Sequence, residues 1–170
     1  MRTEYKRLLI FLVVLFLFII IFTIFLAWPL LTGTKIVLAT QPVDPFDMFR
    51  GQYLNINYEI SRIPSIEGIK IGEDVYVSVK EDESGIWRYD KAGLVEPVKG
   101  VFLKGEIKSV FGGNMMIEYG IEQYFFQRNA RLNTINMTVE ARVSKGGTAR
   151  IVQLFSNGKP IKIDYSETKI

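Results

Sequence analysis

Four acidic residues are the side chains of this sequence that are best suited to catalysis or metal binding. They are Asp44, Asp47, Glu59 and Glu122. Carboxylates held a few ångströms apart can coordinate a metal ion, or act as the acid and base of glycoside hydrolysis. Their spacing in the chain does not by itself bring them together, and an isolated Asp in a loop more often accepts hydrogen bonds within a turn. We therefore expect no metal site, no other cofactor and no catalytic residue.

The composition removes several other kinds of chemistry. The chain contains no Cys and no His, which excludes disulfides, thiolate catalysis and the side chain best suited to proton transfer near neutral pH. A Ser nucleophile activated by Lys, as in signal-peptidase-like hydrolases, would have to lie just beyond a membrane anchor. The first Ser is Ser61, which follows Arg50 and Gly51 instead of preceding them. We expect that the protein is not an enzyme, and a hydrolase is the least favoured alternative.

An apolar segment near the N-terminus predicts a membrane helix. Residues 8–28 contain no charge, and a helix of this length rises about 30 Å, the thickness of the hydrocarbon core of a bilayer. We expect a transmembrane anchor over residues 8–30 that contacts the lipid bilayer. A cleavable signal peptide is the alternative, but the run is longer than is typical of one, and no small-x-small cleavage site follows closely.

The charges around this segment predict its orientation. Arg2, Lys6 and Arg7 precede it with only Glu4 opposing them, so residues 1–7 should stay in the cytoplasm of the cell and residues 31–170 should lie outside. The formal net charge is +3, and removing these flanking residues from the 21 basic and 18 acidic residues leaves 18 and 17. A nearly neutral domain without a basic stripe predicts no nucleic-acid partner.

The rest of the chain reads as short strands separated by turns. Residues 75–79 and 137–143 alternate apolar with polar residues, which is the period of a strand with one buried face. Gly-rich and Asn-rich turns separate the segments. The predicted strands are residues 34–40, 53–60, 74–80, 87–90, 101–110, 114–119, 136–143, 148–155 and 158–165. This pattern predicts one mainly β domain, an antiparallel sandwich or barrel-like fold, and residues 119–128 stay ambiguous between helix and strand.

A short linker and a loop complete the expected organisation. Only residues 29–34, PLLTGT, separate the apolar segment from the first strand, so the domain should lie close to the membrane. Residues 42–49 are too rich in Pro and Asp for a strand interior and predict a loop. From Tyr53 the chain alternates again. Tyr53, Asn55, Asn57 and Glu59 should face solvent or a partner, and Leu54, Ile56, Tyr58 and Ile60 should face the core.

Two segments resemble the motifs of a known family. Residues 50–58, RGQYLNINY, resemble the signature of the GDYXXLXY proteins, which are membrane-anchored proteins named for Gly-Asp-Tyr followed by a spaced Leu and Tyr. Residues 119–125, YGIEQYF, are similar to a second motif of the same family. The order of anchor, signature, second motif and C-terminal strands also matches, so the resemblance covers nearly the whole chain. It implies a membrane anchor and no particular reaction.

The signature departs from the family pattern at two positions. Gln52 stands in place of the family Asp and Ile56 in place of its Leu. Gln cannot act as a general acid or base or as a carboxylate ligand, which favours a structural or hydrogen-bonding role at that position. In that interpretation Gly51 permits a special backbone conformation and Tyr58 fills the core.

A functional interpretation uses the exposed residues of the same region. Asp44, Asp47, Arg50 and Tyr53 would then form a surface that binds another protein or a glycan. In the second motif, Tyr119, Gly120, Glu122, Tyr124 and Phe125 concentrate aromatic rings that either form a ligand platform or, more commonly, pack in a core.

The function that these observations favour is non-enzymatic. We expect a membrane-proximal interaction or assembly module for another membrane protein, and the alternative is a module that binds an envelope glycan or peptide. A concave surface lined with exposed aromatic rings would favour a glycan, whereas a flat apolar patch beside the membrane would favour a protein.

Overall fold

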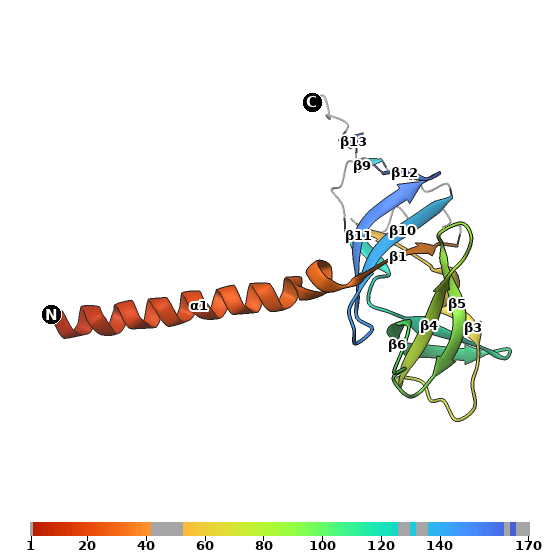
Figure 1. The fold of residues 1–170 in the computed structure, drawn as a ribbon, viewed down its shortest axis with the longest axis horizontal. Coiled ribbons are helices and arrows are strands. Elements are labelled where there is room, and N and C mark those ends of the chain that lie inside the picture. Colours follow the sequence, from red (N-terminus) through yellow and green to blue (C-terminus); the bar gives the residue numbers. More distant parts are fainter. Residues whose placement is uncertain (1, 42–52, 126–129, 132–135, 162–163, 166–170) are drawn as a thin grey trace.

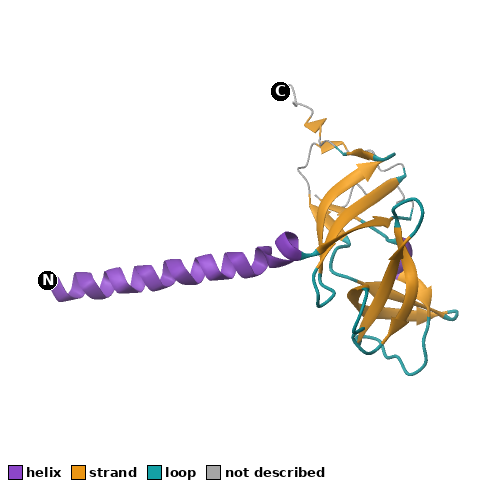
Figure 2. Ribbon diagram, viewed as in Figure 1, coloured by secondary structure: helices purple, strands orange, loops and turns teal. Residues whose placement is uncertain are grey.

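A long helix projects from a β domain (Figures 1 and 2). The computed structural model describes residues 2–41, 53–125, 130–131, 136–161 and 164–165. Helix α1 spans Arg2–Thr32 and is followed by strands with a single helical turn, η2, at Glu59–Ser61. The prediction of a mainly β fold behind one N-terminal apolar helix is confirmed.

Helix α1 is apolar on all sides. Its window Glu4–Trp28 is long and apolar enough to cross a membrane, and none of that window is buried within the protein. A soluble domain would bury one stripe of such a helix, whereas a helix that is apolar all round needs lipid or other helices around it. The helix therefore fits a membrane anchor or a signal sequence, since both can contain a long apolar helix near the N-terminus.

The junction between helix and sheet is shorter than the sequence predicts. Helix α1 continues through Pro29 to Thr32, and strand β1, Thr34–Ala39, begins after Gly33 alone. The expected linker over residues 29–34 is therefore partly helical, and Figure 1 shows α1 running almost directly into β1. Arg142 Nη1 donates to the carbonyl oxygen of Gly33 at 3.0 Å, which fixes the junction to the sheet.

Nine strands form one mixed sheet. Their order is β12-β11-β10-β1-β5-β4-β6-β7-β3. The bounds are β1 Thr34–Ala39, β3 Arg62–Pro64, β4 Asp74–Glu81, β5 Trp87–Gly93, β6 Val101–Phe111, β7 Asn114–Glu118, β10 Met137–Val143, β11 Ala149–Ser156 and β12 Lys159–Pro160. Neighbours are antiparallel except for β1 and β5, which meet in parallel at Leu38 and Trp87. Two further pairs stand apart: β2 Tyr53–Asn55 with β8 Gln123–Phe125, and β9 Ala130–Arg131 with β13 Asp164–Tyr165.

The sheet does not close into a barrel. Its two edges are the short strands β12 and β3, and each contains a Pro, Pro160 and Pro64, which has no N–H to donate to a further strand. Of the two expected architectures, the barrel-like one is therefore wrong. Side chains from both ends of the sheet still meet in one core, which joins Ile36 and Val139 to Leu103 and Ile117.

Most predicted strands are present, with two differences. Within the segment 53–60, only β2 is a strand, and η2 begins at Glu59. The segment 158–165 divides into the two short strands β12 and β13. The ambiguous segment after Tyr119 contains strand β8. Strands β3 and β9 were not predicted, since the first contains a Pro and both are very short.

Candidate functional site

The two motif segments pair with each other, although the 60 residues 59–118 separate them in the chain. Strands β2 and β8 are antiparallel, with Tyr53 opposite Phe125 and Asn55 opposite Gln123. The backbone N–H of Ile56 donates to the carbonyl oxygen of Glu122 at 2.6 Å and extends the pairing by one step. The motifs therefore form one structural unit and are not two separate sites.

Alternate residues of the first motif face the core, as predicted. Leu54, Ile56, Tyr58 and Ile60 are buried, while Asn55, Asn57 and Glu59 are exposed. The motif also pairs with the end of β1, because the N–H of Gln41 donates to the carbonyl oxygen of Asn57 at 2.7 Å. Ile56 thus keeps the inward apolar contact that the family Leu would make.

Two buried tyrosines cross-link the motif segments through hydrogen bonds. The Tyr58 hydroxyl donates to the carbonyl oxygen of Ile121, and the Tyr119 hydroxyl donates to that of Ile60, each at 2.6 Å. Burial, and then the charge of Glu122, raises the pKa of both hydroxyls far above the ordinary value. Both therefore remain protonated donors and cannot serve as bases. These contacts support the structural interpretation of Tyr58.

Glu122 shapes the turn of the second motif. Its Oε1 accepts a hydrogen bond from the N–H of Tyr119 at 2.5 Å, and Gly120 between them has a φ of 78°. A side chain at Gly120 would meet no neighbouring atom, so the left-handed backbone is what requires Gly here. The carboxylate of Glu122 therefore accepts a hydrogen bond within its own turn.

The second acidic candidate, Glu59, belongs to a surface ion-pair network. Arg88 donates to Glu59 through Nη1 and to Asp82 Oδ2 through Nε, the latter at 2.7 Å. Asp82 Oδ1 also accepts the Ser84 hydroxyl at 2.5 Å. The Ser84 hydrogen bond, and then that from Arg88, holds the pKa of the Asp82 carboxyl well below its usual range. The sequence did not reveal this network, although Asp82-x-Ser84 is a typical turn pattern.

Replacing Asp82 with Asn should make the stability of the protein decrease less as the pH falls. Because the pKa of this carboxyl is lowered on folding, its contribution is complete above the ordinary aspartate pKa of about 4 and is lost as the pH falls further. The pair is exposed, so the effect will be small. In thermal unfolding of the full chain in detergent, the difference between wild type and variant should shrink steadily from about pH 5 to pH 2. A difference that grows in acid would contradict the assignment.

Five residues of the predicted interaction surface and signature, Asp44, Asp47, Arg50, Gly51 and Gln52, lie outside the described residues, as does the side chain of Tyr53. Their proposed contact with a protein or a glycan therefore stays a prediction. Among the described residues, no three acidic side chains lie close enough together to hold a metal ion.

Ser61 is half-buried, and its hydroxyl oxygen has no hydrogen-bond partner in the described part of the chain. No Lys among the described residues forms a hydrogen bond with this hydroxyl. We expect Ser61→Ala to leave the free energy of unfolding unchanged or to raise it by about 1 kcal/mol, because an unsatisfied polar group is removed. Thermal unfolding of the full chain measures this effect. A clear loss of stability would show that the hydroxyl has a partner.

The family comparison agrees with this geometry. A model of the GDYXXLXY protein family matches residues 14–154, from within α1 to β11. The chain belongs to the GDYXXLXY family. No curated protein and no solved structure matches it. The match includes the apolar helix as well as the β domain, so the two parts belong to one family unit.

In this GDYXXLXY protein the second motif does not form a continuous aromatic platform. Tyr119 is buried and Tyr124 packs partly buried against the core, whereas Phe125 is 70% exposed. Some aromatic side chains of the motif thus pack in the core, and others lie on the surface. The expectation of core packing holds for Tyr119 and Tyr124.

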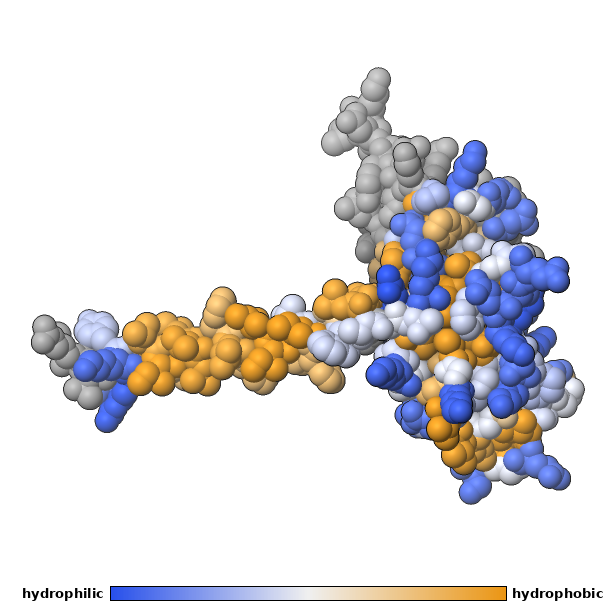
Figure 3. All heavy atoms as spheres, in the orientation of Figure 1, coloured by the Kyte–Doolittle hydropathy of each residue, from blue (hydrophilic) through white to orange (hydrophobic). Residues whose placement is uncertain are grey.

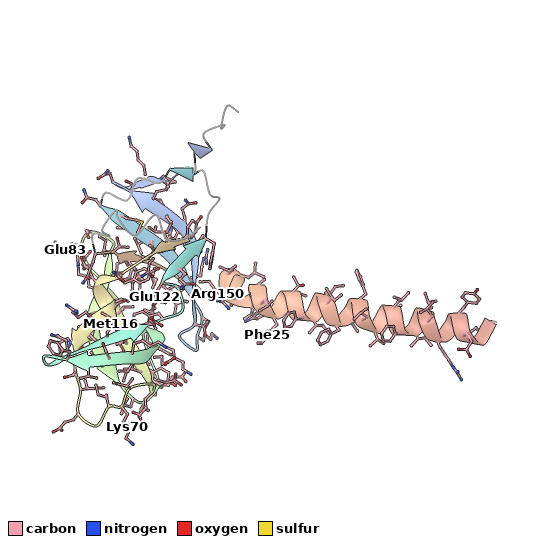
Figure 4. The ribbon with its side chains drawn as sticks, turned by 180° about the vertical axis from the view of Figure 1, so that it is seen from behind. Phe25, Lys70, Glu83, Met116, Glu122 and Arg150 are labelled. Carbon is pink, nitrogen blue, oxygen red and sulfur yellow. The ribbon has the colours of Figure 1, made fainter. Side chains whose placement is uncertain are left out.

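The exposed apolar residues of this GDYXXLXY protein gather elsewhere. Val110, Phe111 and Met116 are exposed at the tip of the β6–β7 hairpin, and Phe111 is 89% exposed. Figure 4 places Met116 on the side of the domain away from α1. Figure 3 shows further apolar surface at the end of the domain where β4 begins. The sequence could have indicated an apolar hairpin tip, since apolar residues stand on both sides of the Gly112-Gly113 turn.

Proposed function

We propose that this GDYXXLXY protein is a single-pass membrane protein whose β domain is a non-enzymatic interaction module for another membrane protein. The N-terminus lies in the cytoplasm and the domain lies outside. The observation that carries the proposal is the attachment of the domain, because Gly33 alone separates an apolar helix from the first strand of the sheet. A domain attached in this way stays at the membrane surface, where a partner must also be.

The chemistry of the motif residues supports a non-enzymatic role. The hydroxyls of Tyr58 and Tyr119 are used to bind backbone carbonyls, and the carboxylate of Glu122 closes a turn. Glu59 pairs with Arg88 on the surface. These hydroxyls and carboxylates therefore already have structural partners.

The exposed tip of the β6–β7 hairpin supports a protein partner. Phe111 extends from a Gly-Gly turn in which both glycines have positive φ, and its side chain contributes nothing to the core. Large apolar side chains at a loop tip cost solubility unless another surface covers them. The tip projects away from α1, so the partner needs a domain of its own on the same side of the membrane (Figures 1 and 4).

Site-specific photo-cross-linking in native membranes tests the partner. A photoreactive residue at Phe111 should capture one or a few proteins that contain membrane segments, and the same residue at the exposed position Lys80 should not. Phe111→Ser should lose the captured protein in co-purification while keeping the wild-type unfolding temperature. Capture of the same species from both positions would contradict a partner at the tip, and retention of a glycan or a soluble peptide instead would favour the alternative binding module.

The absence of Cys allows a clean test of orientation. A single Cys introduced at Glu83, an exposed residue of the β4–β5 turn, should react with a membrane-impermeant maleimide in intact cells. A Cys introduced at Thr3 should react only after permeabilisation. The reverse pattern would overturn the proposed orientation, and release of the chain from membranes by alkaline wash would overturn the anchor.

A further inference from the structure

Three basic residues stand side by side across neighbouring strands at the base of α1. Lys35 of β1 lies opposite Arg142 of β10, and Arg142 lies opposite Arg150 of β11. Residues directly opposite on antiparallel strands point to the same face, with Cβ atoms about 5 Å apart. We call Lys35, Arg142 and Arg150 the basic row.

The charge of the basic row is only partly neutralised. Lys35 Nζ forms an ion pair with Glu140 Oε2 at 2.8 Å, and Arg142 Nη1 donates to the carbonyl oxygen of Gly33. Arg150 is exposed and has no ion-pair partner in the described part of the chain. The sequence contains no acidic residue between Glu140 and Asp164, and the exposed Lys145 of the β10–β11 turn adds a fourth cation nearby.

Like charges directly opposite on adjacent strands destabilise a sheet. One carboxylate for three cations leaves a net positive face, and Glu140 pairs with Lys35, the member of the row farthest from Arg150 in the strand order. Such an arrangement is favourable when an external anion completes it. Arginine side chains bind phosphate oxygens with two parallel hydrogen bonds, so phosphate is the anion that this row suits best.

The position of the row identifies the source of the phosphate. The last turn of α1 contacts β10 and β11, and Figure 4 places Arg150 beside the end of that helix. Figure 3 shows hydrophilic side chains on the side of the domain that faces the helix. The row therefore faces the end of the membrane anchor and not the distal hairpin.

The short chain between Trp28 and Lys35 limits how far the row can lie from the membrane surface. From Trp28 to Thr32 the helix rises about 6 Å, and the next three residues add at most about 10 Å, so Lys35 lies within about 16 Å of Trp28. Trp at this position sits among the lipid headgroups, which extend roughly 5–7 Å beyond the hydrocarbon core. Arg and Lys side chains extend several ångströms further toward the interface.

We propose that the basic row binds the phosphate groups of anionic phospholipids at the membrane surface. This inference rests on the proposed anchoring of α1 in a bilayer. Phosphate binding gives the row a role in seating the β domain on the lipid surface in one orientation, in addition to the covalent connection through Gly33. The attraction depends on charge, so it should weaken with salt and with the loss of anionic lipid.

The test uses the full chain reconstituted into vesicles. A donor fluorophore is attached to a single Cys introduced at Gly146, an exposed position in the β10–β11 turn where a side chain meets no neighbouring atom. Lipid headgroups carry the acceptor. Energy transfer should be higher in vesicles with about 30 mol% phosphatidylglycerol than in pure phosphatidylcholine, and the difference should decrease when salt rises from about 0.05 to 0.5 M.

A matched pair of charge reversals tests the row itself. Arg150→Glu should reduce the difference between the two lipid compositions by at least about half, since one of three cations becomes an anion. Arg150→Lys should keep most of the difference. Lys70→Glu changes the net charge equally at the exposed far end of the domain and should have no effect (Figure 4). Thermal unfolding of each variant confirms that it folds.

The outcomes separate this inference from the anchoring proposal. Wild-type protein that resists alkaline extraction but shows equal energy transfer in both vesicle types overturns lipid binding and leaves the anchor intact. Wild-type protein that is extracted from vesicles overturns the anchor first. If lipid composition has no effect and Arg150→Glu instead removes the cross-linked protein partner, the row binds an acidic protein surface, and the lipid proposal is wrong.

Discussion

Replacing Gly105 with Ala is expected to destabilise the β domain by roughly 2–3 kcal/mol, or to prevent folding. Gly105 lies in β6, and a Cβ atom added there would overlap Ile117 Cγ2 and come within 2.9 Å of both the carbonyl oxygen of Glu118 and Tyr119 Cδ1. A backbone oxygen and a buried ring cannot move aside without disturbing the core. The expected fall in the unfolding temperature of the full chain in detergent is about 10 °C.

A second glycine provides the control for this prediction. Gly93 ends β5, and a Cβ atom there would meet no neighbouring atom, so Gly93→Ala should change the stability by less than about 0.5 kcal/mol. The two substitutions have the same chemistry and differ only in the space around them. Equal stability of the two variants would show that the close packing of Tyr119 on Gly105 is not present in solution.

Removing the hydroxyl of Tyr58 or of Tyr119 is expected to cost about 1–3 kcal/mol each. Each Phe substitution leaves a buried carbonyl oxygen, that of Ile121 or of Ile60, without its donor. Because the two bonds join the same pair of segments in opposite directions, the double variant should not lose the sum of the single losses. Thermal unfolding of the wild type, both single variants and the double variant in detergent measures this coupling.

Tyr89→Phe is the matched control for the tyrosine series. Tyr89 is partly exposed and its hydroxyl forms no hydrogen bond among the described residues, so loss of the hydroxyl should change stability by less than about 0.5 kcal/mol. Wild-type stability of Tyr58→Phe together with loss of the cross-linked partner would contradict the structural role and make the motif tyrosine a contact residue. Loss of stability with the partner retained would confirm it.

The local pattern of the sequence predicted which face each residue occupies. Alternation at residues 53–60 placed Ile56 and Tyr58 in the core, and the structure confirms this even though only three of these residues form a strand. Burial depends on the direction of the side chain, and an extended chain alternates direction whether or not it has a strand partner. The long apolar run likewise predicted α1, since periodicity is not needed for a helix that is apolar all round.

The sequence alone did not predict the contacts between distant segments. The pairing of β2 with β8 joins two motifs that a single sequence shows only as separate peptides. The same holds for the ion pair between Arg88 of β5 and Glu59 of η2. The sequence also did not reveal the requirement for Gly105, because its cause is the close approach of residues 117–119 and not a turn in its own backbone. Strand register and side-chain contact are set by the tertiary fold.

The absence of a linker after α1 has a mechanical consequence. A helix whose apolar length exceeds the local bilayer thickness accommodates the mismatch by tilting. Where a flexible tether would absorb that tilt, the Gly33 junction, with Arg142 bonded across it, transmits the rotation to the sheet. In a bilayer, such a rotation would move the β6–β7 hairpin most, because it lies on the side of the domain away from α1 (Figure 1). If α1 is anchored in a bilayer as proposed, a change in bilayer thickness would therefore change the position of the exposed tip.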